Sequence, residues 1–146
     1  MASSYTVTWQ AYKNGPDLDE GITLTYAITA HTDGTVTDIT TNTDKLPDGV
    51  SALTSIIKGK YLRMVEAFPT AGGTAPDAAD VTVKDADGLD LLNDGGAELI
   101  HATAKQAVYP LMNDVSAKML VTGALTIGIA NQETNGANFT IRLYFQ

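Results

Sequence analysis

Four aspartates lie within the short stretch VKDADGLDLLNDGG, and carboxylates at such spacing could bind calcium, form a catalytic pair or stabilise a turn. A calcium loop of the EF-hand type requires oxygen ligands at positions 1, 3 and 5, glycine at position 6 and glutamate at position 12. Counted from Asp85, position 5 is Leu89, position 6 is Asp90 and position 12 is Gly96. These three mismatches argue against an EF-hand loop.

The same stretch fits the pattern of a hairpin turn. Asp85 takes the first turn position and Gly88 the fourth, and apolar residues stand on both sides. We therefore predict a structural turn, with adventitious cation binding as the alternative. Carboxylate catalysis is not expected, because one acid of a catalytic pair needs a pKa raised by burial and this glycine-rich segment is expected to be hydrated.

The remaining reactive side chains form no catalytic motif. The chain has no cysteine, and its two histidines, His31 and His101, lack a carboxylate at the spacing of a zinc motif or a triad. No G-x-S-x-G motif occurs, and the KGKY segment that starts at Lys58 lacks the upstream glycine and the hydroxyl residue of a phosphate loop. We therefore expect no enzymatic activity, no cofactor and no metal site.

Three tyrosines, Tyr12, Tyr61 and Tyr144, could face outward and stack on sugar rings. Packing in the core or at an interface is the commoner fate of such residues, and it is the expectation here. A carbohydrate-binding β-sandwich module is the alternative, and a coplanar set of exposed aromatic rings would distinguish it.

The overall composition is that of one acidic domain. With 146 residues the chain is long enough for a single hydrophobic core, so we expect one domain over residues 1–146. The net charge is −8 and no basic stripe is present, so nucleic acid is not an expected partner. The absence of cysteine, of a signal-peptide pattern and of a long apolar run predicts a soluble protein made in a reducing cytosol, with no membrane partner.

The charged residues are unevenly distributed along the chain. Lys58, Lys60 and Arg63 form a basic cluster, whereas residues 77–98 carry seven acids and one lysine. Two hydrated faces explain this distribution. The alternative is complementary docking between neighbouring subunits, with the basic cluster against an acidic hairpin.

Apolar and polar residues alternate with a period of two along most of the chain, which is typical of half-buried strands. The predicted strands cover residues 5–12, 22–31, 35–41, 61–68, 80–84, 120–130 and 138–145. Asp-Gly or Asn-Gly pairs predict turns at Gly34, Gly49, Gly88 and Gly136. Residues 98–111 are expected to form a long irregular connection between sheets, with a short helix as the alternative. The pattern predicts an all-β fold, an antiparallel two-sheet sandwich of jelly-roll-like form.

The strands at residues 120–130 and 138–145 lack the lysine or proline that commonly protects a sheet edge. We therefore predict that these strands lie at open edges that meet neighbouring subunits of a homo-oligomer. The candidate interface residues are Phe139, Ile141 and Tyr144, together with the basic cluster.

Three segments of the chain follow one another in a characteristic order. They are YLRMVEAFPTAGGTAPDAADVTVKDADGLDLLNDGGAE, then AVYPL, then LVTGALTIGIANQETNGANFTIRLYF. This order, which covers Tyr61 to Phe145, resembles a group of structural proteins of tailed bacteriophages. The resemblance brings no catalytic or ligand-binding residues with it.

The resemblance implies a component of the virion, made in the host cytoplasm. It implies a capsid decoration, or cement, protein on the head exterior, with a neck or tail component as the alternative. The implied partners are the phage major capsid protein or neighbouring virion proteins. A trimer is the favoured oligomer, because a trimer suits the local threefold positions of a shell.

Overall fold

The computed structural model of the chain describes residues 2–13, 20–43, 52–113 and 115–146. The strands are β1 (Ser4–Lys13), β2 (Glu20–Thr29), β3 (Ile39–Thr40), β4 (Tyr61–Pro69), β5 (Asp80–Lys84), β6 (Gln106–Val108), β7 (Leu111–Met112), β8 (Val115–Ser116), β9 (Met119–Leu120), β10 (Thr126–Ala130) and β11 (Asn138–Phe145). One single-turn helix, α1 (Thr54–Ile57), accompanies them within these ranges, and no described helix is long and apolar enough to cross a membrane. The predicted all-β class is confirmed.

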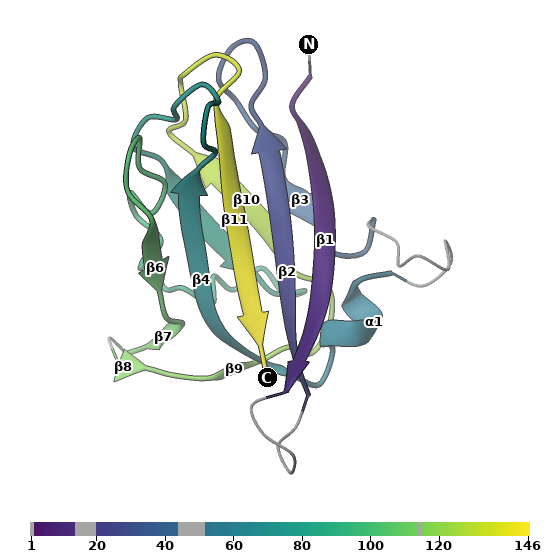
Figure 1. Cartoon of the computed structure of the whole chain (residues 1–146). Coiled ribbons are helices and arrows are strands. Elements are labelled where there is room, and N and C mark those ends of the chain that lie inside the picture. The colour runs from purple at the N-terminus through teal and green to yellow at the C-terminus, as the bar shows by residue number, and fades with distance from the viewer. Residues whose placement is uncertain (1, 14–19, 44–51, 114) are drawn as a thin grey trace.

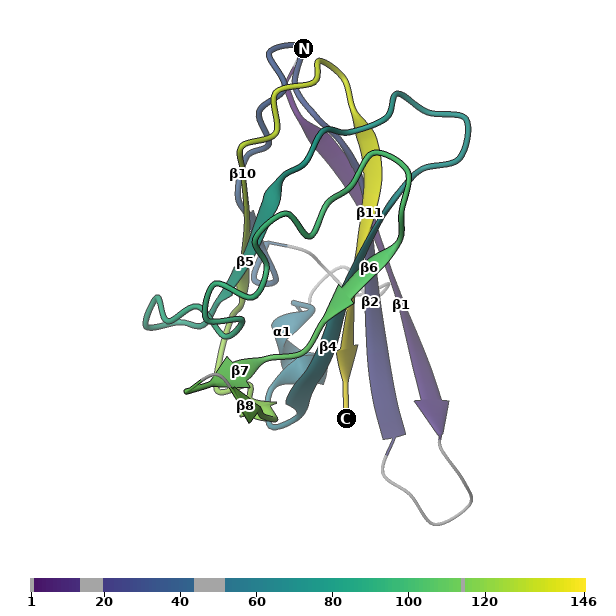
Figure 2. The ribbon, with the colours of Figure 1, turned by 90° about the vertical axis from the view of Figure 1, so that its left-hand side faces the viewer.

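Two antiparallel sheets form the layers of the molecule (Figures 1 and 2). In the described residues the large sheet has the order β1-β2-β11-β4-β6, and β9 pairs with the start of β4. The small sheet has the order β3-β10-β5, and β7 and β8 pair as a separate short hairpin. The predicted two-sheet sandwich is therefore confirmed.

The hydrophobic core lies between the two sheets. Alternate residues of the large sheet point into it, and the small sheet supplies the opposite side with Ile39, Val81, Val83 and Ile127. Each fully buried side chain of this size stabilises the fold by roughly 1.5–3 kcal/mol. The fully buried residues contributed by β2 and β11 include Leu24, Tyr26, Phe139, Ile141, Leu143 and Phe145.

The prediction that residues 120–130 and 138–145 form open edges is wrong. β11 lies between β2 and β4, and β10 lies between β3 and β5. Residues 120–130 are moreover not one strand, because β9 pairs with the large sheet and β10 belongs to the small one. Alternation shows which side chains share a face, but it does not show where a strand lies within its sheet.

The connection over residues 98–111 crosses between the sheets, as predicted, and it contains no helix. Ile100 bridges Ala79 beside β5, and β6 then pairs with β4 in the large sheet. The predicted strand over residues 35–41 is shortened to β3. Upstream of β3 the backbone N–H of Thr37 donates to the side chain of Ser3 instead of to a neighbouring strand.

Three of the four predicted turn glycines adopt a left-handed backbone conformation. The φ angles are 87° at Gly34, 88° at Gly88 and 62° at Gly136. The predicted turn at Gly49 lies outside the described residues. Each of the three follows an aspartate or asparagine, in line with the turn pattern in the sequence.

Gly96 marks a close approach between the acidic segment and β5. The backbone N–H of Val81 donates to the carbonyl oxygen of Gly96 at 2.9 Å. A Cβ atom on Gly96 would lie only 1.9 Å from the carbonyl oxygen of Val81, which is backbone and has little freedom to move. A side chain at this position therefore forces the two segments apart.

We predict that Gly96→Ala lowers the free energy of unfolding by about 3 kcal/mol, the upper end of the usual cost of overpacking. Gly123→Ala is the matched control, because its Cβ would make an ordinary contact of 3.4 Å with Ala86. Urea unfolding with an unchanged slope measures both values. Equal stabilities for the two variants would contradict the close packing described here.

Candidate functional site

A groove of about 1090 Å³ lies on the outer face of the large sheet, the face turned away from the core. Its floor comes from β2 and β11, whose outward residues alternate with the core residues of the same strands. β1 and β4 flank this floor, and the segment that includes β8 contributes further side chains. The lining of this outer groove consists of Thr8, Trp9, Gln10, Tyr12, Thr23, Thr25, Arg63, Met64, Tyr109, Ser116, Ala117, Lys118, Arg142, Tyr144 and Gln146.

Tyr12 lies across the sheet surface because the residue opposite it is a glycine. Tyr12 on β1 pairs with Gly21 on β2, and a Cβ on Gly21 would come within 2.6 Å of three atoms of the tyrosine ring. The ring thus covers the glycine, and its hydroxyl donates to the carbonyl oxygen of Phe145 on β11 at 3.2 Å. Burial raises the pKa of Tyr12, and this effect outweighs the opposing effect of the nearby Arg63 guanidinium.

A network around Glu66 holds Tyr144 against the same surface. Glu66 is 7% exposed, and its Oε2 accepts a hydrogen bond from the Tyr144 hydroxyl at 2.9 Å. The Lys105 ammonium lies 2.9 Å from the same oxygen, and Arg142 Nη1 lies 3.6 Å away. Both cations also lie 5.3 Å from the centre of the Phe68 ring. The buried carboxylate is thereby neutralised, and Tyr144 is fixed along the sheet.

The lining of the outer groove is cationic although the whole chain carries a net charge of −8. Arg63, Lys118 and Arg142 line the groove, and no Asp or Glu is among the lining residues that the structure describes. Arg142 is committed to Glu66, and Arg63 donates to the side chain of Gln146. The Lys118 ammonium makes no hydrogen bond or ion pair within the described part of the chain. The groove therefore offers positive charge to a ligand.

Two of the predicted interface residues, Phe139 and Ile141, are misplaced. Both are 0% exposed, because they belong to the face of β11 that packs against the small sheet. No partner chain could contact them without opening the core. Their neighbour Tyr144 has the opposite orientation and lines the outer groove.

The basic cluster does not act as a unit in the structure. Lys58 is exposed directly after α1, and the backbone of Lys60 pairs with Val121 at 2.8 Å. Arg63 lines the outer groove, whereas neither lysine is among the lining residues. Docking of this cluster on an acidic hairpin of another subunit stays a prediction.

The acidic segment forms the predicted turn. Asp85 Oδ1 accepts the backbone N–H groups of Asp87 and Leu89 at 3.0 and 2.9 Å, and the backbone of Asp85 also pairs with that of Leu89. These carboxylates therefore stabilise the backbone of the turn. The carboxylate of Asp90 accepts three further backbone N–H groups, those of Val83, Leu92 and Asp94.

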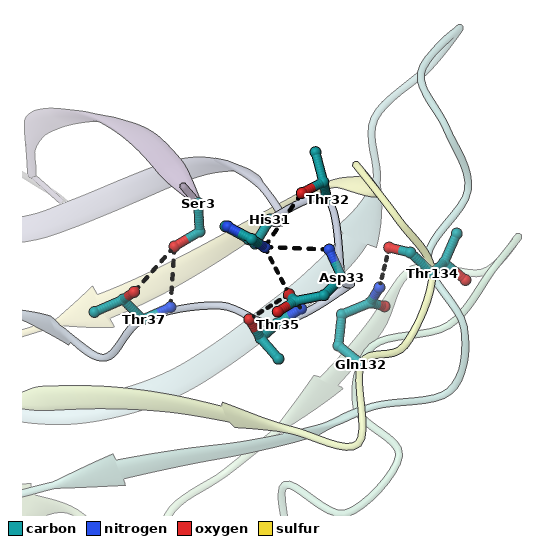
Figure 3. Close-up of polar contacts among 8 residues, drawn as sticks. All are labelled: Ser3, His31, Thr32, Asp33, Thr35, Thr37, Gln132 and Thr134. Atoms are coloured by element: carbon teal, nitrogen blue, oxygen red, sulfur yellow. Dashed lines mark hydrogen bonds and ion pairs between the residues drawn. The ribbon is translucent and has the colours of Figure 1, made fainter. Parts of the chain in front are cut away.

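His31 and Asp33 form a second arrangement that could suggest chemistry (Figure 3). The His31 Nδ1 atom lies 2.8 Å from Asp33 Oδ1, in the turn that follows β2. The same oxygen accepts the hydroxyl of Thr35 at 2.6 Å and its backbone N–H at 3.0 Å. Ser3, which Figure 3 also shows, bonds to Thr37 and not to His31 in the contacts drawn. The pair therefore stabilises a turn, and these contacts supply no activated nucleophile.

The second histidine also serves its own loop. His101 Nδ1 accepts the backbone N–H groups of Thr103 and Ala104 at 3.2 and 3.1 Å. Among the described residues, no group of three or more His, Asp or Glu side chains is arranged to hold a metal ion.

Comparison of the chain with protein-family models, with curated proteins and with solved structures finds no match. The outer groove is therefore interpreted from its own residues. Sequence reasoning singled out Tyr12, Tyr144 and Arg63 but missed Tyr109 and Lys118, which reach the groove only through the pairing of distant strands.

The two hydrogen bonds from Thr35 lower the pKa of Asp33 to about 2, from a usual value of 3.8. A lowered carboxyl pKa stabilises the fold above about pH 4, and this stabilisation is lost as the pH falls toward 2. We predict that Thr35→Val, which removes the hydroxyl donor, moves the Asp33 midpoint upward toward 3.8. Carboxyl titration by NMR measures it, with Thr37→Val as the control because Thr37 does not bond to Asp33.

Proposed function

We propose that this protein is a structural component of a tailed-bacteriophage virion, a decoration protein that binds the outside of the capsid and stabilises it. The resemblance of residues 61–145 to phage structural proteins suggests this class. The proposal is consistent with a small all-β domain whose distinctive features are surfaces. Its partner is the major capsid protein, and it acts as a homo-oligomer, most simply a trimer.

The observation that carries the proposal is an apolar corner, made of Tyr61, Tyr109, Met112, Val115 and Leu120. These are five of the seven large apolar side chains exposed in the described residues, and Val115 is 67% exposed. Tyr61 pairs with Leu120, and Met112 pairs with Val115. In Figure 1, β7 and β8 lie at the lower left of the large sheet, and β9 runs from there along its lower end to the start of β4. Exposed apolar groups concentrated at one end of a molecule in this way mark a protein interface.

The coat is the partner that fits this corner best. A decoration protein binds a repeated surface with many weak contacts, and each copy needs only a small apolar anchor. Packaged DNA repels a chain of net charge −8, which favours a position outside the shell. The five side chains of the corner are apolar apart from the tyrosine hydroxyls, so burying these side chains against another protein has little desolvation cost.

The long edge strand β1 supports contacts between copies. β1 is regular over ten residues, and its stretch Ser4–Tyr12 contains no proline and no charged side chain. Such an edge is a suitable template for strand pairing with another chain. The other described sheet edges, β3, β5 and β6, are two to five residues long.

A neck or tail component is the second candidate, because the same resemblance includes such proteins. The two are distinguished by particles that lack the protein. For a decoration protein, these particles assemble but lose DNA at lower temperature, and added protein restores resistance with a saturable stoichiometry. Heads of normal resistance that fail to join tails would instead support the neck or tail role.

We predict that the double variant Met112→Ser/Val115→Ser binds depleted capsids about 100-fold more weakly than the unmodified protein. The variant removes roughly 3 kcal/mol of apolar burial at the interface, and every 1.4 kcal/mol changes affinity tenfold. Both side chains are exposed, so its stability is expected to change little. Co-sedimentation of purified protein with depleted capsids measures the affinity.

The matched control is Ala71→Ser/Ala75→Ser, which introduces the same hydroxyl groups at exposed positions in the loop after β4. It should bind capsids like the unmodified protein. Equal capsid binding by the two double variants would show that the apolar corner is not the surface that contacts the coat.

A further inference from the structure

Two tyrosine side chains, Tyr12 and Tyr144, lie along the outer groove, and the Tyr12 ring lies over the backbone of the sheet. The Tyr12 ring covers Gly21 and is tied to Phe145 O across the intervening strand. The Tyr144 hydroxyl reaches Glu66, two residues along β4 from its register partner Met64. Both rings are therefore pinned along the sheet by their hydroxyl groups. Flat, rigid aromatic faces are the surfaces on which sugar rings stack.

The polar groups around these rings indicate the charge of the ligand. Arg63 lies close enough to Tyr12 for its charge to act on the phenol, and Lys118 makes no ion pair within the described residues. Threonine hydroxyls on β1 and β2 line the same groove, whereas no Asp or Glu side chain of the described residues does. A ligand that stacks on tyrosine, bonds to hydroxyls and carries negative charge fits all three features.

We propose that the outer groove binds an acidic oligosaccharide, in which a sugar ring stacks on Tyr12 and a uronic or sialic acid carboxylate pairs with Arg63 and Lys118. The groove volume of about 1090 Å³ accommodates several sugar rings. The site belongs to the isolated chain, so the inference does not rest on a role in the virion. On a particle, it would attach the virion to acidic polysaccharide.

Other polyanions fit the groove less well. A chain of net charge −8 repels the closely spaced phosphates of nucleic acid. An acidic peptide would satisfy the cations but would leave the tyrosine faces without a stacking partner. These two classes are controls in the binding experiment.

Isothermal titration calorimetry measures binding directly, whereas the only tryptophan, Trp9, pairs with Leu24 and so carries its side chain on the other face of β1 from Thr8 and Gln10. The purified protein is titrated with oligogalacturonate, oligomannuronate and α2,8-linked oligosialic acid, and the heat of binding is followed. We expect a saturable heat of binding with at least one of them. Poly-glutamate and oligo-dT should give none, and the methyl ester of the bound oligosaccharide should bind at least tenfold more weakly.

Variants separate the two parts of the site. Lys118→Gln and Arg63→Gln should each weaken the acidic ligand about tenfold and leave the weak binding of the methyl ester unchanged. Gly21→Ala, whose Cβ displaces the Tyr12 ring, should weaken both ligands, and so should Tyr12→Ala. The matched controls are Lys58→Gln, an exposed lysine outside the groove, and Gly123→Ala, and both should bind like the unmodified protein.

Three results would overturn the inference. The first is no saturable heat of binding with any of the three acidic oligosaccharides. The second is binding of poly-glutamate with the same affinity as the acidic oligosaccharides, which would show that the groove attracts any polyanion by charge alone. The third is an equal loss of binding in Lys58→Gln and Lys118→Gln. Capsid binding is measured separately, so failure here leaves the decoration role untouched, and failure of that role leaves this site testable.

Discussion

The pairing of β11 along both of its edges is the interaction on which the rest of the structure depends. β11 pairs with β2 over residues 138–145 and with β4 over residues 139–145 (Figure 1). It joins the hairpin of β1 and β2 to the strands that follow α1, and its inward side chains fill the centre of the core. The large sheet is therefore incomplete until β11, the last of the described strands along the chain, is in place. Long-range pairing of this kind is associated with slow folding.

The same strands build the core and the outer groove, so the two cannot vary independently. In β11, Ile141 and Leu143 face the small sheet, whereas Arg142 and Tyr144 face the groove. A shift of one residue in register would exchange the two sets. The Glu66 network adds a polar constraint on the same register, because its members come from different strands and from the crossing connection. A rigid scaffold thus holds the exposed surfaces on which the proposed functions rest.

The sequence carried enough information for the fold class but not for the position of each strand. The alternation in YTVTWQAY and NFTIRLYF predicts both strands, yet it cannot show that β11 is central. For this reason the prediction of Phe139 and Ile141 as interface residues is wrong, and both lie in the core. The strands β7, β8 and β9 have two residues each, which is too short for an alternation of apolar and polar residues to be recognised. No pattern in the sequence therefore indicates the apolar corner. The groove depends on pairings such as that of Tyr12 with Gly21, which a single strand does not reveal.

The most direct test of the account is cryo-electron microscopy of the virions that contain the protein. We predict copies of the sandwich on the outer surface of the capsid, with the corner of Tyr61, Met112 and Val115 against the coat and the outer groove open to solvent. Density for the protein at the neck or tail alone, or a capsid-bound copy whose apolar corner faces solvent, would contradict it.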